Sequence, residues 1–263
     1  MKIGVFDSGL GGLLILKAIA KKLPAYDYEY FGDTKHVPFG DRSESEIFQF
    51  TKEAVEYLFE HDCLIVILAC NTASAETLRT LQDEWLPEHY PDRRILGVII
   101  PMVEEVIADH CQHVLLLGTQ RTVGSGKYHL ELGKRNEIDT KIEAIATPSL
   151  VPLLESGDVA EAVAETAAVI RERQSRGDRV DGVILGCTHY NLMVEPLRAA
   201  FPDVEFFGQA EIIPQKLTQY LEAHEALETQ LSRGGTRNVH VTEHRPEYDL
   251  HMQELLEGRL MEA

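Results

Sequence analysis

Two cysteines each follow a short apolar run, at the point where a buried strand would end. The runs are VILACNT (66–72), which holds Cys70, and VILGCTH (183–189), which holds Cys187. Such runs predict parallel strands covered on both faces, and the polar residues after them favour the start of a helix. Both thiols are therefore expected at strand C-termini, where open α/β sheets bind their ligands. Two acid–base groups facing each other across a small cleft would suit the transfer of a proton from one face of a carbon to the other.

A second pair of segments indicates that the chain has two similar halves. The cysteine runs are 117 positions apart, and the apolar runs IGVFDSG (3–9) and VLLLGTQ (114–120) are offset by almost the same distance. Each half thus supplies one small polar loop and one cysteine loop. A chance pairing of two generic strands would also explain the second match, but it explains the cysteine repeat less well.

The thiols have a structural as well as a chemical interpretation. Free cysteine is more often buried packing than catalytic, and a thiol acts as a base only as thiolate, which a helix N-terminus and polar neighbours favour. Cys187 favours chemistry because it repeats the setting of Cys70 and adds His189 two residues later. One cysteine and one histidine per loop are too few ligands for a metal, so no metal site is predicted. Cys63 is expected in the core.

The loop DSGLGG (7–12) follows the first predicted strand and opens a helix. Its glycines would let backbone N–H groups approach a carboxylate or phosphate. A nucleotide is disfavoured because the G-x-G-x-x-G spacing is missing and Asp7 would repel a pyrophosphate. A plain tight turn with Asp7 as its cap remains the alternative.

Three further segments carry polar groups of uncertain role. The loop DTKHVPFG (33–40) precedes Ser43, a good helix N-cap, so both function and ordinary capping are plausible. The segment GTQRTVGSGKY (118–128) brings hydroxyls to the rim of the second half. In TPSLVPLLE (147–155), Glu155 is a lone acid after an apolar turn, and it is either solvated surface or part of a site.

Composition narrows the class of protein. The chain has 263 residues, 44% of them hydrophobic, and a net charge of −18, which argues against nucleic acid as the main partner and favours simple solubility. The longest apolar run has 8 residues, so neither a membrane span nor membrane association is predicted. Strand-like sequence begins at once, which is unlike a signal peptide. Four cysteines without CxxC spacing indicate reduced thiols and a cytoplasmic location.

Strand-like and helical stretches alternate along the chain, which predicts α/β units with parallel sheets. The expected strands are 2–6, 28–31, 64–69, 95–99, 113–118, 141–145, 181–186, 204–207 and 237–241. The expected helices are 11–22, 44–60, 73–84, 102–110, 121–134, 158–174, 191–200, 210–223 and 246–257. The polar stretch 222–237 is expected to be an exposed connection.

Taken in order, six of these segments resemble the glutamate racemases of the cofactor-independent aspartate/glutamate racemase superfamily. They are FDSGLGG (6–12), YFGDTKHVPFGDRS (30–43), ACNTASA (69–75), GTQRTVGSGKY (118–128), LVPLLE (150–155) and GCTHY (186–190). The resemblance implies two pseudo-twofold-related parallel-sheet α/β domains, 1–96 plus 214–263 and 97–213, with the active site between them and commonly a homodimer. It implies an isomerase that interconverts L- and D-glutamate without a cofactor and supplies D-glutamate for peptidoglycan synthesis.

The resemblance also implies roles for particular residues. Cys70 matches the thiol that acts on D-glutamate and Cys187 the thiol that acts on L-glutamate. Asp7 assists the first thiol, His189 the second, and Glu155 matches an acid near the second thiol. Substrate contacts are implied for Asp7, Ser8, Phe39, Gly40, Asn71, Thr72, Thr119, Thr122, Thr188 and His189.

Three positions depart from the pattern. Phe39 stands where the family usually has tyrosine, Ile100 where it often has glutamate, and Asn191 where it usually has proline. They leave the rate, the dimer packing and the regulation open. The alternatives are an aspartate or hydantoin racemase, or a decarboxylase of the same superfamily, and a non-catalytic protein that binds an amino acid. The presence of both thiols disfavours a decarboxylase, whose relatives tend to use one.

Overall fold

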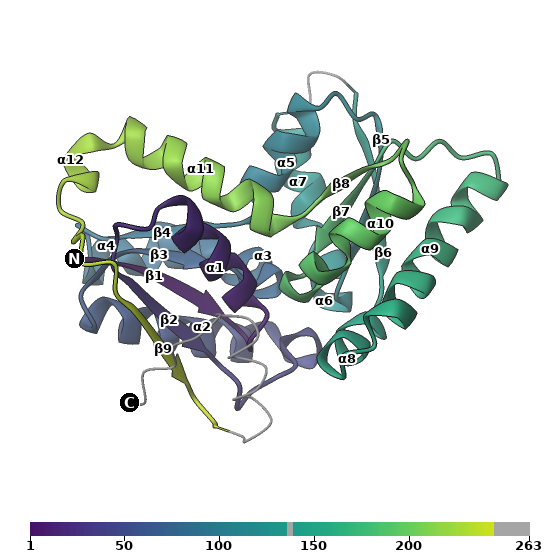
Figure 1. Cartoon of the computed structure of the whole chain (residues 1–263). Coiled ribbons are helices and arrows are strands. Elements are labelled where there is room, and N and C mark those ends of the chain that lie inside the picture. Colours follow the sequence, from purple (N-terminus) through teal and green to yellow (C-terminus); the bar gives the residue numbers. More distant parts are fainter. Residues whose placement is uncertain (136–138, 245–263) are drawn as a thin grey trace. The chain divides into compact units, whose positions relative to one another are not determined.

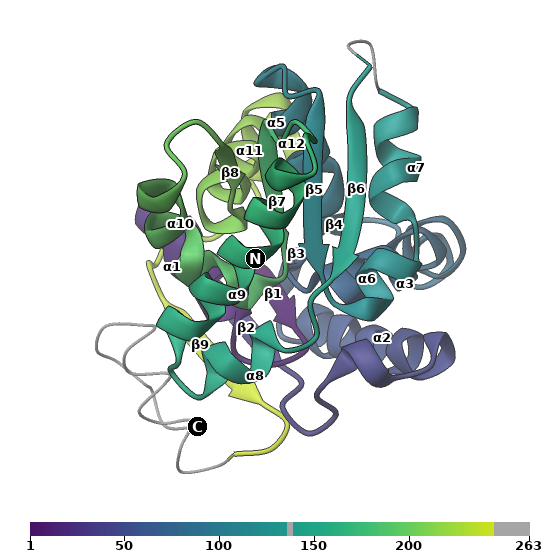
Figure 2. The same cartoon turned by 90° about the vertical axis from the view of Figure 1, so that its right-hand side faces the viewer.

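The computed structural model describes residues 1–135 and 139–244, and the helix expected at 246–257 lies outside the described residues. The contacts divide the chain into two compact units, one made of residues 1–98 with the chain from Ile213 onward, the other of 99–212. Each unit is a parallel sheet with helices on its faces (Figures 1 and 2). The predicted α/β class with two parallel-sheet domains is confirmed.

The first unit is built on a five-stranded parallel sheet in the order β4-β3-β1-β2-β9. Its strands are β1 (Lys2–Asp7), β2 (Tyr28–Gly32), β3 (Cys63–Leu68), β4 (Arg94–Gly97) and β9 (Arg237–Val241). All residues of β3, and all but the first of β1, are buried, as expected for strands covered on both faces.

The placement of the helices of the first unit on the two faces of its sheet follows from the strand order. They are α1 (Gly12–Lys22), α2 (Glu44–Glu60), α3 (Asn71–Thr80), α4 (Leu86–His89), most of α11 (Gln209–Ala223) and α12 (Glu225–Glu228). The chain moves outward from β1 to β2 and then back across β1 to β3. Because such crossovers are right-handed, α1 and α2 must lie on opposite faces of the sheet (Figure 1). Ser43 caps α2, as the sequence predicted, and the structure adds a reciprocal pairing of Ser43 with Glu46.

The second unit repeats this arrangement with the order β6-β5-β7-β8. Its strands are β5 (His113–Gly118), β6 (Lys141–Ala146), β7 (Gly182–Gly186) and β8 (Glu205–Phe207). Its helices are α5 (Ile99–Ala108), α6 (Gln120–Gly124), α7 (Lys127–Gly133), α8 (Leu150–Glu155), α9 (Val159–Ser175) and α10 (Val194–Ala200). Figure 2 shows α7 on one side of this sheet and α9 and α10 on the other. The thiol strands β3 and β7 therefore have equivalent places beside β1 and β5.

Four local predictions need correction. The helix expected at 121–134 is broken into α6 and α7 by Gly126, whose φ of 63° lies in the left-handed region that ends a helix. The apolar turn before Glu155 is helix α8, and the connection 222–237 contains the short helix α12. The helix expected from residue 73 begins at Asn71, directly after Cys70.

Candidate active site

Asp7 ends β1 at the carboxyl edge of the first sheet. Its carboxylate is buried, and Oδ2 accepts the backbone N–H of Gly9 at 3.2 Å. The hydroxyl of Tyr30, one strand away on β2, donates to the carbonyl of Gly9 at 2.8 Å. Burial raises the pKa of Tyr30 well above its usual range, and the nearby charges of Asp7 and Cys70 add to this. Tyr30 thus stays neutral and fixes the loop after Asp7, a role that the sequence did not reveal.

Cys70 follows β3 at the same edge of the sheet and forms the N-cap of α3. Its sulfur accepts the backbone N–H of Ala73 at 3.5 Å and lies 3.3 Å from Oγ of Ser8. A hydroxyl can donate to a thiolate and accept from a thiol, so Ser8 can serve both forms of the sulfur. Asn71 and Thr72, both buried, form the first turn of α3, where backbone N–H groups lack helical partners and favour an anion.

The loop after β2 places Phe39 in the same apolar cluster as Cys70. Phe39 and Gly40 lie in a short 3-10 helix (Phe39–Asp41), and the ring of Phe39 is buried in the apolar cluster that also contains Cys70. Its ring centroid lies 6.2 Å from that of Phe6 and 6.1 Å from that of Phe50. The predicted residues Ser8 and Cys70 are thus in direct contact, Asp7 precedes Ser8 in the same loop, and Phe39 packs in the cluster that contains Cys70.

In the second unit, three of the predicted residues form a continuous chain. Cys187 follows β7, and its sulfur lies 3.8 Å from Nδ1 of His189. Nε2 of the same imidazole lies 3.3 Å from Oε1 of Glu155, at the end of α8. Glu155 is half-exposed, whereas Cys187 and His189 are buried. Glu155 is thus a partly solvated acid that also contacts this cluster through His189.

The imidazole in this chain is held in its protonated form. Burial alone would lower the pKa of His189, but its hydrogen bonds with Cys187 and Glu155 and their negative charges raise it to about 10. An imidazolium beside a sulfur stabilises negative charge on that sulfur. The Glu155–His189–Cys187 chain therefore places a cationic ring beside a thiol, an arrangement suited to proton transfer.

The remaining predicted residues of the second unit lie in two short turns. Thr119 is the N-cap of α6: its Oγ1 accepts the N–H of Thr122 at 3.1 Å and lies 3.0 Å from the Thr122 hydroxyl. Thr188 is buried at the start of a 3-10 helix (Thr188–Met193). Both turns follow paired strands, β5 and β7, at the carboxyl edge of the second sheet.

Two supports of the Cys187 turn were missed in the sequence. The hydroxyl of Tyr190 donates to the carbonyl of Thr147 at 3.0 Å and lies 2.8 Å from the Thr147 hydroxyl. Burial raises the pKa of Tyr190, and the charge of Cys187 adds to it, so this tyrosine stays protonated. The two residues lie in the segments GCTHY (186–190) and TPSLVPLLE (147–155), but nothing local in either segment indicates that they meet.

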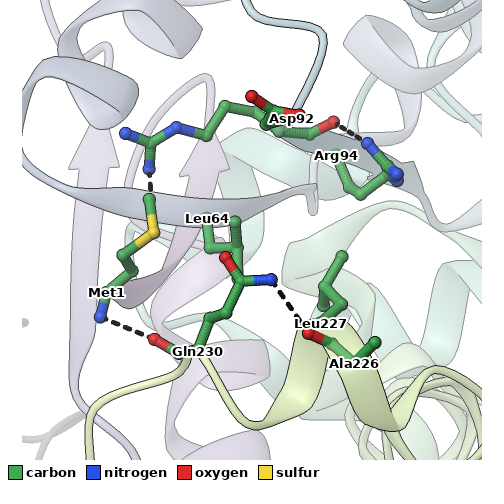
Figure 3. A pocket seen from close by; sticks show the side chains of 8 residues that line it. Met1, Leu64, Asp92, Arg94, Ala226, Leu227 and Gln230 are labelled. Atoms are coloured by element: carbon green, nitrogen blue, oxygen red, sulfur yellow. Dashed lines mark hydrogen bonds between the residues drawn. The ribbon is translucent and has the colours of Figure 1, made fainter.

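A cavity of about 480 Å³ in the first unit is lined by a different set of residues (Figure 3). It is lined by Leu64 at the start of β3, whereas Cys70 follows the end of that strand. Its arginines are engaged locally: Arg93 donates to the carbonyl of Cys63, and Arg94 to those of Pro91 and Arg93. This cavity therefore carries none of the predicted site residues.

Within residues 1–135 and 139–244, no cluster of three or more His, Cys, Asp or Glu side chains could hold a metal ion. Over the same part of the chain, no helix is long and apolar enough to cross a membrane.

The fold and the paired thiol loops define a class of protein in which two similar α/β units each present a cysteine at the carboxyl end of a central strand. The sequence pattern of the Asp/Glu/Hydantoin racemase family matches residues 13–213. The chain belongs to this family.

Individual relatives agree with this assignment. The chain is 38% identical over 236 residues to a glutamate racemase of Roseobacter denitrificans, covering 85% of this chain and 86% of the relative. A glutamate racemase isoform from Bacillus anthracis has a similar structure, with a TM-score of 0.85, 27% identity, and coverage of 98% of this chain and 95% of that one. The enzyme from Francisella tularensis, solved in complex with D-glutamate, has a TM-score of 0.83, 26% identity, and coverage of 99% and 95%.

Proposed function

We propose that this protein is a glutamate racemase that interconverts L- and D-glutamate with two thiols and no cofactor. The observation that carries the proposal is the Glu155–His189–Cys187 chain, because it supplies a charged acid–base unit in a member of this racemase family. The relatives at 38% identity and the solved structures named above support glutamate as the substrate.

In this proposal, Cys187 removes the Cα proton of L-glutamate. His189, whose pKa is raised by its contacts with Cys187 and Glu155, stabilises the thiolate of Cys187 before the transfer as an imidazolium. The sulfur becomes a neutral thiol when it takes the proton, and the electron pair of the broken C–H bond stays on the substrate as a carbanion. Such a carbanion requires fixed dipoles around the substrate carboxylate.

Cys70 would complete the reaction from the other face of Cα. As a neutral thiol it donates its proton to the carbanion, which forms D-glutamate and leaves a thiolate. The N–H of Ala73 and the hydroxyl of Ser8 are placed to stabilise that thiolate. Positioned acids and bases of this kind typically accelerate proton transfer by about 10²–10⁴-fold.

The substrate carboxylates would be bound by the turns around the two thiols. We assign this role to backbone N–H groups at Asn71–Thr72 and Thr188–His189, and to the hydroxyls of Thr119 and Thr122. The support is their location: all lie in turns at the carboxyl ends of parallel strands, where α/β sheets bind ligands. The family resemblance implies further substrate contacts for Ser8, Phe39 and Gly40.

Circular dichroism tests the proposal directly. Purified protein is incubated separately with L-Glu, D-Glu, L-Asp and D-Asp, without added cofactor, and the optical signal is followed to equilibrium. We expect both glutamate enantiomers to converge on a racemic mixture, because enantiomers have equal free energy. Turnover of aspartate instead of glutamate would identify the sister activity, and glutamate binding without turnover of any of the four would identify a non-catalytic binding protein.

The proposal extends to the cellular setting of the enzyme. We propose that the enzyme supplies D-glutamate for peptidoglycan synthesis, works in the cytoplasm and forms a homodimer, as the family resemblance and the cysteine usage suggest. Size-exclusion chromatography with light scattering would test the dimer, and loss of cell shape on depletion, reversed by added D-glutamate, would test the role.

A further inference from the structure

A single amide joins the Cys187 turn to the start of a helix. Nδ2 of Asn191 donates to the carbonyl of Thr188 at 2.7 Å, and Oδ1 of Asn191 accepts the backbone N–H of Ala210 at 2.8 Å. Ala210 lies in the first turn of α11, whose N–H groups have no partners within the helix. Both ends of the Asn191 amide are therefore engaged with backbone groups.

The glycine at position 208 leaves room for this amide. A Cβ on Gly208, just before α11, would lie 3.2 Å from Oδ1 of Asn191 and 2.9 Å from a methyl of Val194. A side chain at position 208 would therefore crowd the amide oxygen of Asn191 and the methyl of Val194. The close approach indicates a defined contact, made within one compact unit.

Holding the Thr188 carbonyl also orients the next peptide group. Because the peptide bond is planar and trans, the N–H of His189 must point opposite to the carbonyl of Thr188. The ring of His189 is separately held between Cys187 and Glu155. Asn191 thus determines where the backbone of this turn presents its N–H, while Glu155 determines where its imidazole lies.

We propose that Asn191 is a positioning residue for the Cys187 half of the reaction. The inference rests on the proposed function, in which the N–H groups at Thr188–His189 bind a substrate carboxylate and Cys187 acts on L-glutamate. Asn191 itself contacts neither the substrate nor the reacting atoms; it acts by fixing the Thr188–His189 peptide.

An aspartate substitution removes one of the two hydrogen bonds of the Asn191 amide and keeps the other. Asn191→Asp keeps an oxygen that accepts the Ala210 N–H, and aspartate is a good acceptor at a helix N-terminus. It replaces the donor to Thr188 by an oxygen that faces a carbonyl oxygen. We expect this variant to fold and to lose about tenfold in kcat/KM, equally in both directions because the equilibrium constant is one.

Isotope effects provide the readout that a merely structural role would not change. If the Cys187 step is slowed, the isotope effect on kcat/KM should rise for L-[2-²H]glutamate, whose deuteron Cys187 removes. It should fall for D-[2-²H]glutamate, because there Cys187 only donates a solvent proton. A loss of folded protein would lower kcat/KM without altering either isotope effect.

Gln82 offers a matched control, since its Nε2 donates to the carbonyl of Ile95 at the same distance of 2.7 Å in the other unit. Gln82→Glu should leave both isotope effects unchanged. Asn191→Ala, which removes both contacts, should shift them as Asn191→Asp does and substitutes for it if the latter does not fold.

Two outcomes would overturn the inference: wild-type isotope effects in both folded Asn191 variants, or the same shift in Gln82→Glu. The proposed function fails separately, if the wild-type protein does not racemise glutamate or if Cys187→Ala remains active.

Discussion

Nε2 of His189 lies 3.3 Å from Oε1 of Glu155, and this contact adds to that of Cys187 in raising the pKa of the imidazole. The opposite nitrogen of the ring faces the sulfur of Cys187, so one carboxylate acts on a thiol through a histidine. Cys70 has a different setting, with a serine hydroxyl and a helix N-terminus around its sulfur. The two thiols thus follow equivalent strands, but the groups that contact their sulfur atoms differ.

Replacing Glu155 by glutamine should lower the pKa of His189. The wild-type pKa of about 10 is above the ordinary 6.5, so the stability from the protonated ring is fully present below about pH 6.5 and is lost as pH rises through about 10. Without the carboxylate, this loss should begin at lower pH, and the alkaline limb of the pH–rate profile should move with it. An NMR titration of His189 measures the shift. Glu161→Gln, an exposed acid on α9, is the control, and an unchanged His189 titration in Glu155→Gln would contradict the contact.

Removing the Ser8 hydroxyl should weaken catalysis by about 3–10-fold in kcat/KM, the scale of one hydrogen bond of about 0.5–1.5 kcal/mol. Ser8→Ala leaves the sulfur of Cys70 with the Ala73 N–H but without its hydroxyl partner. Steady-state kinetics in both directions measure the loss. Ser175→Ala removes an exposed hydroxyl that bonds a helix carbonyl and should have no effect. Full activity of Ser8→Ala would show that this hydroxyl does not support the thiol.

Phe39→Tyr should be tolerated and should change substrate affinity by at most about 1–1.5 kcal/mol. The ring packs beside Phe6 and Phe50 in the cluster that contains Cys70, and the added hydroxyl restores the group usual in the family. Phe50→Tyr places a hydroxyl on a neighbouring ring and controls for effects on packing. KM values and thermal unfolding distinguish binding from stability. A folded but inactive Phe39→Tyr protein would weaken the assignment of the substrate contacts around it.

The two-thiol mechanism predicts the fate of the transferred proton. In deuterated water, the first D-glutamate formed from L-glutamate should carry nearly full deuterium at Cα, because the thiol of Cys70 exchanges with the solvent and donates a deuteron. The remaining L-glutamate should carry little. Mass spectrometry of separated enantiomers measures both. Cys70→Ala and Cys187→Ala should each reduce racemisation by orders of magnitude. Substantial protium in the early product would refute two bases, as would near-normal turnover in either variant.

Asp27 should make the first unit sensitive to acid. Burial alone would raise its pKa, but hydrogen bonds from Ser232, Thr236 and Gly234 outweigh it and hold the pKa well below 3.8. This stabilisation is therefore present above about pH 4 and is lost as pH falls. Asp27→Asn should cost about 1–3 kcal/mol in the free energy of unfolding at pH 7 and less at low pH. Urea unfolding at several pH values tests this, with the exposed Asp83→Asn as control; equal losses at all pH values would contradict it.

The sequence alone determined the elements and the class of fold. Strand runs such as 64–69 and 181–186 were predicted because burial on both faces leaves a continuous apolar pattern in the chain. The polar residues after them placed Cys70 and Cys187 at strand ends. The local signals for helix boundaries were weak near Glu155 and Gly126. For this reason, helix α8 and the break between α6 and α7 were not predicted from the sequence.

Only the tertiary structure decided which of these groups meet. Ser8 reaches Cys70 because β1 and β3 are neighbours in the sheet, and Glu155 reaches His189 because α8 packs on the turn after β7. The same holds for the amide of Asn191 and the start of α11. Hydrophobic periodicity reports whether a residue is buried, but strand order and helix packing determine which distant loops share an edge of the sheet, and these depend on the whole fold.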